Sequence, residues 1–278
     1  MKTYYILILS IILVSCAEKK QETPTEIIEV VTTQKIVKEE FQFLIDSANL
    51  DGAILIYDTE EDTYYSNDYK WCEEGKIPAS TFKIPNSIIA LELGIAKNDS
   101  TIIKWDGQTR WNNNWNQDLI LRDAFHYSCV PCYQDIARQV GVKRMNEYVT
   151  KLAYGKMQVD SNNLDMFWLE GVSEINQFEQ IDFLKRFYQN ELPISSHSYS
   201  TMKKMMVIKD TNNYKISGKT GWGFQNGKDN VWFVGYLETN HKVYYFATNL
   251  SPKGEFDINV LVNTRKELTN KAIDLIVN

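Results

Sequence analysis

Histidine is scarce in this sequence, since only three occur among 278 residues. A metal site built from several imidazole ligands is therefore not expected, and we predict no metal cofactor. Basic residues are outnumbered as well, because 30 Lys and Arg face 36 Asp and Glu, which gives a formal net charge of −6. Nucleic-acid binding needs a basic surface that neutralises phosphates, so a nucleic-acid partner is not expected either.

The apolar run at the N-terminus, within MKTYYILILSIILVSC, is too short for an ordinary membrane-spanning helix. One lysine precedes it and small residues follow it, as in a signal peptide. The segment LVSC, at positions 13–16, resembles the lipobox of bacterial lipoproteins. We expect residues 1–15 to be the signal peptide, Cys16 to be lipid-modified, and the protein to be periplasmic and anchored to a bacterial membrane. A plain secretory signal with an incidental cysteine is the alternative.

Cysteine is also rare, and three remain after Cys16: Cys72, Cys129 and Cys132. An odd number cannot form a fully paired set. Cys129 and Cys132 make a C-x-x-C, a spacing found in redox and zinc sites, but no second C-x-x-C accompanies it. We expect both to be small buried apolar residues. A disulfide between them is the alternative.

The apolar pattern divides the rest of the chain into a tether and a folded body. Residues 16–36 are polar and predict a tether. Within residues 37–278, β-rich stretches occur early and late, and helical spacing dominates between them. We therefore predict an α+β fold with an antiparallel sheet flanked by helices, built from about 37–79 and 205–278. A helical lobe is expected at about 80–204, with a cleft between the lobes.

The segment PASTFKIP places Ser80 and Lys83 three positions apart, on one face of a helix. A hydroxyl at a helix N-terminus lies near backbone N–H groups that can stabilise an oxyanion. The apolar sequence that follows predicts a buried helix, so desolvation lowers the pKa of Lys83. A neutral amine can accept a proton from a serine or react with a small electrophile. The spacing alone is a weak signal, because Ser200 and Lys203 repeat it on a helix expected to be exposed.

Two further motifs strengthen the interpretation of this pair: S-C-V at 128–130 and K-T-G at 219–221. In the order S-x-x-K, S-x-[VN], K-[TS]-G, the three match the penicillin-recognising serine enzymes. Gly221 would let a strand edge approach an extended acyl-amide substrate closely. The longer segments STFKIPNSIIALELGI, SCVPCYQDIARQVG, FWLEG and KTGWG resemble the class D, oxacillinase-type, serine β-lactamases over about residues 37–278.

The resemblance implies hydrolysis of β-lactam antibiotics of the penicillin and oxacillin type through an acyl-enzyme on Ser80. Lys83, N-carboxylated by carbon dioxide or bicarbonate, would be the general base for acylation and deacylation. Ser128 would protonate the leaving lactam nitrogen with Lys219 beside it, and Trp168 would hold the modified lysine. The residues that would bind the substrate or control access to the lysine are Thr220, Gly221, Trp222, Arg265, Val130 and Leu169.

Two positions depart from the family pattern. Tyr-Gly-Asn becomes Tyr154-Gly155-Lys156 and adds a charge that we expect near the rim of the cleft, and Cys129, inside the S-x-V motif, adds an oxidisable thiol beside the site. Three other functions remain open. The chain could be a β-lactam sensor that stays acylated, a cell-wall transpeptidase or carboxypeptidase, or a non-catalytic binding module. The tryptophan after K-T-G and the FWLEG segment favour the β-lactamase.

Overall fold

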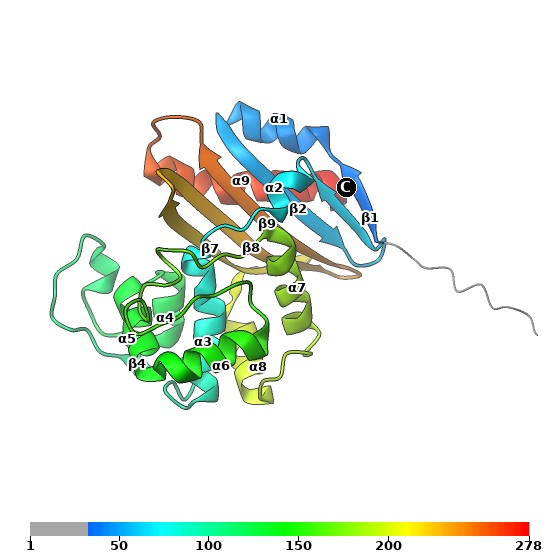
Figure 1. Cartoon of the computed structure of the whole chain (residues 1–278). Coiled ribbons are helices and arrows are strands. Elements are labelled where there is room, and N and C mark those ends of the chain that lie inside the picture. The colour runs from blue at the N-terminus through cyan, green and yellow to red at the C-terminus, as the bar shows by residue number, and fades with distance from the viewer. Residues whose placement is uncertain (1–32, 278) are drawn as a thin grey trace, which may run out of the picture. The chain divides into compact units, whose positions relative to one another are not determined.

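A seven-stranded sheet in the order β1-β3-β2-β9-β8-β7-β6 runs through the computed structural model, which describes residues 33–277 (Figure 1). Strand β2 pairs with β9 from Leu50↔Pro252 to Asp58↔Tyr244, so the two ends of the folded body share one sheet, as predicted. The neighbours are antiparallel except β1 and β3. The strands are β1 Gln34–Val37, β2 Leu50–Asp58, β3 Thr63–Ser66, β6 Val207–Asp210, β7 Tyr214–Gln225, β8 Lys228–Thr239 and β9 Val243–Pro252.

The long hairpin of β7 and β8 is closed by the two residues Asn226 and Gly227. Both have positive φ, 53° and 76°. Asn-Gly is the pair that best tolerates these angles, and such turns match the right-handed twist of the flanking strands. The tight turn therefore fixes the register that places the K-T-G segment on β7 opposite the buried middle of β8.

Each face of the sheet is covered by its own apolar core. Helices α1 (Glu39–Ser47) and α9 (Ile258–Val277) bury one face. On α9, Leu268, Ala272 and Ile273 are buried, which places them on one apolar face of the helix. Because both faces of β8 are covered, its central residues form a continuous apolar run instead of an alternating one.

The helical lobe surrounds helix α3, which contacts α5, α6 and α8 (Figure 1). Its apolar residues form a core that continues onto the second face of the sheet. The elements between β3 and β6 are α2 Tyr69–Glu73, η1 Ala79–Phe82, α3 Lys83–Glu92, β4 Ile102–Ile103, η2 Asn113–Trp115, β5 Leu119–Ile120, α4 Leu121–His126, α5 Val130–Val140, α6 Val142–Leu152, α7 Gln177–Tyr188 and α8 Ser196–Met205.

Two boundaries differ from those predicted. The segment 80–204 is not purely a helical lobe, because it contains the β4–β5 pair and because α7 packs on the sheet. Gln177, at the start of α7, donates from Nε2 to the carbonyls of Ala53 (3.0 Å) and Ala247 (2.5 Å). An apolar stripe on a helix does not reveal whether its partner is another helix or a sheet, so the sequence could not assign α7 to a lobe.

The predicted tether, 16–36, overlaps strand β1, which pairs in parallel with β3. All four residues of β1 are exposed, so its composition resembles a linker although its backbone is paired. The predicted signal peptide, Cys16 and the tether up to residue 32 lie outside the described residues. Within the described part of the chain, no helix has both the length and the apolar character needed to cross a membrane.

Candidate active site

Ser80 and Lys83 lie where η1 passes into α3. Ser80 belongs to the 3-10 turn and Lys83 is the first residue of the α-helix, so the α-helix begins three residues later than predicted. The Lys83 ammonium or amine Nζ donates to Ser80 Oγ at 3.0 Å. Pro85 falls in the first turn of α3, where a missing N–H leaves no helical hydrogen bond unmade.

Burial sets the protonation state of Lys83. Its side chain is fully buried, and no carboxylate forms an ion pair with it among residues 33–277. Desolvation lowers its pKa from 10.5 to about 7. A neutral amine is therefore accessible near neutral pH, as the sequence predicted.

Trp168 lies against the same turn and carries an unused hydrogen-bond donor. Its ring stacks on that of Phe82, the residue before Lys83, with 5.6 Å between centroids. The indole is fully buried, and its Nε1 has no hydrogen-bond partner in the described structure. Buried donors are nearly always paired, so this N–H is suited to an acceptor that the unmodified chain does not supply.

A group of buried polar side chains is hydrogen-bonded to or within η1. Thr81 donates to the carbonyl of Pro78 at 2.7 Å, and its Oγ1 lies 3.0 Å from the hydroxyl of Tyr154. Gln180, on α7, donates to the same Thr81 oxygen at 3.0 Å. These bonds fix the turn that carries Ser80 relative to both the helical lobe and the sheet.

Ser128 and Lys219 meet across the cleft from different lobes. Ser128 lies between α4 and α5 with a positive φ of 51°, and Lys219 lies on β7. Lys219 Nζ donates to Ser128 Oγ and, at 3.1 Å, to the carbonyl of Thr220. Desolvation, and then the positive charges of Lys83 and Arg265, hold the pKa of Lys219 well below its usual value. The amine beside the Ser128 hydroxyl is thus a suitable proton acceptor.

Gly221 lets β7 approach the turn that carries Ser80. A Cβ at this position would lie 3.1 Å from the carbonyl oxygen of Pro78 and 3.2 Å from Thr81 Cγ2. Arg265, on α9, donates to the Gly221 carbonyl, and its Nε has no partner among the described residues. Burial lowers the pKa of Arg265 to about 9. A buried guanidinium without a carboxylate partner is a strong potential site for an anionic group.

A cleft of about 600 Å³ opens beside Ser80. Lys83, Trp168 and Lys219 do not line it, because they are buried behind its wall. The structure thus brings the predicted residues into two layers, one facing the cleft and one behind it. Those that line the cleft are Ser80, Ser128, Val130, Leu169, Thr220, Gly221, Trp222 and Arg265.

Sequence reasoning missed the aromatic side chains that complete the cleft. Trp111, Tyr127 and Phe224 line it and are exposed. They belong to no motif, although the tryptophan- and asparagine-rich loop around Trp111 was a visible signal. Lys156, by contrast, is absent from the lining, is 76% exposed and pairs with Glu174 at 3.0 Å. The charge it adds is therefore paired on the surface and does not line the cleft.

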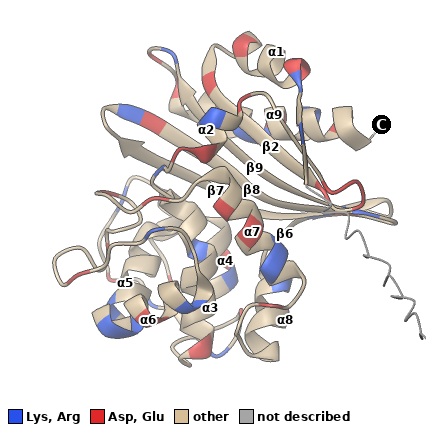
Figure 2. Ribbon diagram, turned by 45° about the vertical axis from the view of Figure 1, so that its right-hand side comes forward, with Lys and Arg blue, Asp and Glu red and all other residues tan. Residues whose placement is uncertain are grey.

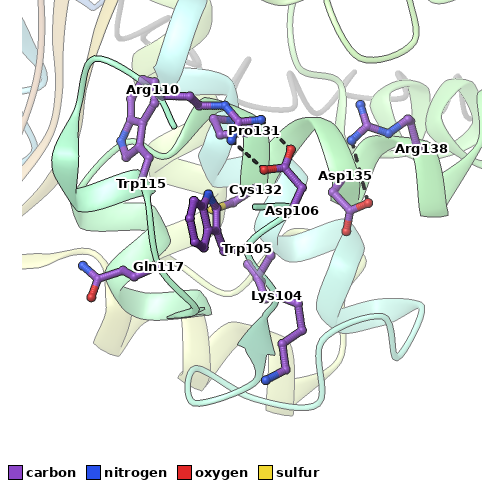
Figure 3. Close-up of a pocket in the computed structure, with 11 residues that line it drawn as sticks. Lys104, Trp105, Asp106, Arg110, Trp115, Gln117, Pro131, Cys132, Asp135 and Arg138 are labelled. Atoms are coloured by element: carbon purple, nitrogen blue, oxygen red, sulfur yellow. Dashed lines mark hydrogen bonds and ion pairs between the residues drawn. The ribbon is translucent and has the colours of Figure 1, made fainter. Parts of the chain in front are cut away.

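A smaller pocket of about 280 Å³ shares Trp115 with the cleft (Figure 3). Figure 3 shows Pro131 and Cys132 on its wall. Cys129 and Cys132 are joined by a disulfide, which corrects the expectation of two free buried thiols, and Cys72 is free and buried. Sequence spacing could not decide this, because pairing depends on how the first turn of α5 folds.

The structure shows no group of three or more His, Cys, Asp or Glu that could hold a metal ion within residues 33–277. The cleft and the layer behind it bring together two hydroxyls, two desolvated amines, one guanidinium and the backbone around them. Such an arrangement can attack a carbonyl, stabilise an anionic substrate group and deliver a proton to a leaving nitrogen.

Comparison with known proteins agrees with this geometry. The penicillin binding protein transpeptidase domain family matches residues 45–270. The β-lactamase OXA-48 of Klebsiella pneumoniae is 39% identical over 199 residues, which cover 72% of this chain and 75% of that protein. The crystal structure of the class D β-lactamase YbXI from Nostoc is 38% identical with a TM-score of 0.81, and the match covers 85% of this chain and 98% of that one.

A receptor domain is also similar. The C-terminal domain of the Bacillus licheniformis BlaR penicillin-receptor is 28% identical with a TM-score of 0.79, over 87% of this chain and 96% of that one. The family predicted from the motifs is nevertheless confirmed by the relatives that share more of the sequence. The chain belongs to the class D serine β-lactamases, hydrolases of β-lactams within the penicillin-binding transpeptidase family.

Proposed function

We propose that this β-lactamase hydrolyses penicillin- and oxacillin-type substrates through an acyl-enzyme on Ser80, with N-carboxylated Lys83 as general base for both steps. One observation carries the proposal. A fully buried lysine with a pKa of about 7 lies 3.0 Å from the Ser80 hydroxyl, without a carboxylate partner in the described structure.

The surroundings of Lys83 fit carboxylation. Carbon dioxide reacts with an unprotonated amine, and burial supplies this form near neutral pH. The added carboxylate would need hydrogen-bond donors inside an apolar niche. The unpaired indole N–H of Trp168, held by stacking on Phe82, is one such donor. When present, this group supplies a base that takes a proton from Ser80 and then from the deacylating water.

The remaining residues bind and protonate the substrate. Arg265, with Thr220 beside it in the cleft lining, binds the substrate carboxylate. Ser80 attacks the lactam carbonyl, and the C–N bond breaks as Ser128 gives its proton to the nitrogen. Lys219, already bonded to Ser128, tunes this transfer, and Ser128 regains the proton that left Ser80. Val130 and Leu169 line the cleft as apolar residues that limit access of water and carbon dioxide to the lysine.

The test removes and restores carbon dioxide. The purified full chain is assayed with one penicillin and one oxacillin at mildly acidic pH, first in degassed buffer and then with bicarbonate. We expect activity to fall on degassing and to recover with bicarbonate. In parallel, ¹³C-bicarbonate should give a carbamate signal that is absent from Lys83→Met. Full activity without bicarbonate, or no carbamate signal from an active protein, would contradict the role of Lys83.

A β-lactam sensor is the second candidate, and the likeness to the BlaR receptor domain favours it. Both candidates are acylated at Ser80, but only the hydrolase releases the acyl group. Mass spectrometry of the protein after mixing with a penicillin measures this directly. We expect the adduct to disappear as substrate is exhausted, whereas an adduct that persists for hours would identify a sensor.

The proposal includes export and lipid anchoring through Cys16, which lies outside the described residues. The short apolar run and the LVSC segment support it. Labelled fatty acid should be incorporated into the wild type and not into Cys16→Ala, and only the wild type should sediment with membranes. Equal labelling of both chains would overturn the assignment.

A further inference from the structure

Ser128 is held in an uncommon backbone conformation. Its φ of 51° lies in the left-handed region, which costs free energy for a residue other than glycine. Two backbone hydrogen bonds connect this segment to α4. The N–H of Ser128 donates to the carbonyl of Phe125 at 3.1 Å, and the N–H of Cys129 donates to the carbonyl of Ala124 at 2.9 Å. The placement of the Ser128 hydroxyl therefore depends on what fixes the residues just after it.

The disulfide fixes those residues covalently. It joins Cys129, the N-cap of α5, to Cys132 and so closes the first turn of the helix. Cys129 Sγ also accepts the N–H of Cys132 at 3.3 Å. Val130, inside this closed turn, lines the substrate cleft. One covalent ring thus adjoins Ser128 and contains a residue of the cleft wall.

The two cysteine residues differ in exposure. Cys129 is fully buried, whereas 9% of Cys132 is exposed. Cys132 and Pro131 line the smaller pocket and not the cleft (Figure 3). A small thiol can therefore approach the Cys132 sulfur from that pocket without passing through the substrate site.

We propose that the Cys129–Cys132 bond is a redox-sensitive site that positions Ser128, so that its reduction by a small dithiol slows acylation. The inference rests on the proposed role of Ser128 in protonating the lactam nitrogen. It concerns the acylation step alone, because Ser128 has no proposed part in the attack of water on the acyl-enzyme.

The chemistry is a two-electron thiol–disulfide exchange. A thiolate of the dithiol attacks Cys132 Sγ, the S–S bond breaks, and the electron pair leaves on Cys129 Sγ. The N–H of Cys132 and the N-terminus of α5 stabilise this leaving thiolate. The second thiol of the dithiol, as its thiolate, then attacks the other sulfur atom of the dithiol, which is bonded to Cys132 in the mixed disulfide. This attack releases Cys132. The dithiol becomes a cyclic disulfide, and its two protons end on Cys129 and Cys132.

Reduction removes the constraint while every catalytic side chain remains present. The first turn of α5 can then open, and Ser128 can leave its left-handed conformation. Its bond to Lys219 is lost for part of the time. Since small displacements of a catalytic group already reduce rates strongly, we expect acylation to slow about tenfold.

The main experiment compares three states of one full-length chain in saturating bicarbonate: oxidised, reduced with dithiothreitol, and reoxidised. Single-turnover acylation and deacylation rates are measured with a chromogenic penicillin, and alkylation of Cys129 and Cys132 is mapped by mass spectrometry. We expect both cysteines to be alkylated only after reduction. Acylation should slow about tenfold, deacylation should stay unchanged, and reoxidation should restore the first rate.

A variant cycle identifies the group through which the bond acts. In Ser128→Ala, reduction should produce no further slowing of acylation, because the positioned hydroxyl is already gone. Cys129→Ser with Cys132→Ala keeps an acceptor at the N-cap, whereas Cys129→Ala with Cys132→Ala removes it. If the covalent bond positions Ser128, both double variants should be acylated at the rate of the reduced wild type. Cys72→Ala, the remaining cysteine of the described body, should keep the full response to dithiothreitol.

Failure of the inference and failure of the proposed function give different results. If the oxidised chain is not acylated at all, the proposed function is wrong. If it is acylated and both cysteines are alkylated after reduction without a change in rate, the positioning role is overturned. Resistance of the native disulfide to dithiothreitol overturns the proposed access through the smaller pocket. If reduction slows acylation equally in Ser128→Ala and in the wild type, the disulfide has a general structural effect, and this result also overturns the inference.

Discussion

The chain contains the same S-x-x-K spacing twice, and the two copies behave differently. In the first, Lys83 donates to Ser80 inside a fully buried niche. In the second, Ser200 donates to the carbonyl of Ser196 at 2.9 Å on α8. Lys203 lies 3.8 Å from Glu238 and over the ring of Tyr188, and it keeps 35% of its side chain exposed. Spacing brings the pair together, but only the surroundings make it reactive.

The same contrast extends to the other cations of the molecule. Acidic and basic residues are interspersed along the ribbon in the view of Figure 2. Many of the surface cations lie within 4.0 Å of a carboxylate, as Lys104 does with Asp118 and Lys271 with Glu267. Within residues 33–277, Lys83, Lys219 and Arg265 form no such ion pair. Buried cations without counter-charges are costly, so their retention points to function.

The largest expected effect separates the two serines. Ser80→Ala should remove the acylated group and lower hydrolysis by about 10⁴-fold or more, because no other nucleophile lies in its place. Ser200→Ala, the matched control, should leave the rate within about twofold, since its hydroxyl only bonds the preceding turn. Hydrolysis rates and covalent labelling by a penicillin measure both. Adduct formation in Ser80→Ala would break the comparison.

The next effect separates the two lysines. Lys83→Met keeps the length of the side chain and removes the base, so both acylation and deacylation should slow by about 10²- to 10⁴-fold. Lys203→Met should leave both rates unchanged, because Lys203 lies outside the cleft lining. In the wild type, a folded-state pKa of about 7 predicts that activity in low bicarbonate falls as pH drops below that value. A flat pH profile would contradict a neutral Lys83.

Stability should change in the opposite direction to activity. The pKa of Lys83 is lowered from 10.5 to about 7, so the unfolded chain binds a proton that the folded chain lacks between those values. This residue therefore makes folding less favourable at pH 7, and its penalty fades as pH rises towards 10.5. In degassed buffer at pH 7, the free energy of unfolding of Lys83→Met should be roughly 2–4 kcal/mol higher than that of the wild type. Denaturant titrations at pH 7 and 10 measure the difference, which should shrink at the higher pH.

Much of the site could be predicted because its chemistry lies in short local motifs. Ser80 and Lys83 share one turn, and the K-T-G segment lies on one strand, so sequence spacing already determines which residues meet within each motif. The walls of the cleft could not be predicted in the same way. Trp111 reaches it from a loop and Phe224 from the end of β7, which is far away in the sequence, and only the tertiary fold brings them together.

The predictions that differ from the observed structure have a related cause. Strand β1 is exposed along its whole length, so burial leaves no periodic pattern in its sequence. Helix α7 shows the apolar stripe expected of a helix, but its partner is the sheet. The disulfide depends on the first turn of α5, which C-x-x-C spacing permits without requiring. In each case the missing information lies in contacts between elements and not within them.

A smaller effect is expected for Arg265. Arg265→Ala removes from the cleft a guanidinium that has no carboxylate partner among residues 33–277, so the KM for penicillins should rise and kcat/KM should fall about 10- to 100-fold. Covalent labelling of Ser80 should still occur at high concentrations. A β-lactam in which the carboxylate is esterified supplies the control, because its kcat/KM should differ little between the wild type and the variant. An equal loss for both substrates would show that Arg265 supports the structure of β7 and does not bind the carboxylate.

The smallest effect is expected where the sequence departs from its family. Lys156 forms an exposed pair with Glu174 and a backbone bridge to the same residue, and it does not line the cleft. An exposed pair contributes about 0–1 kcal/mol, so Lys156→Asn should lower stability slightly and leave kcat/KM within about twofold for every penicillin tested. The bridge is made by backbone atoms, which asparagine retains. A change in substrate preference in Lys156→Asn would show that a paired surface cation can influence the cleft, and the contrast between buried and exposed cations would then fail as a guide to function.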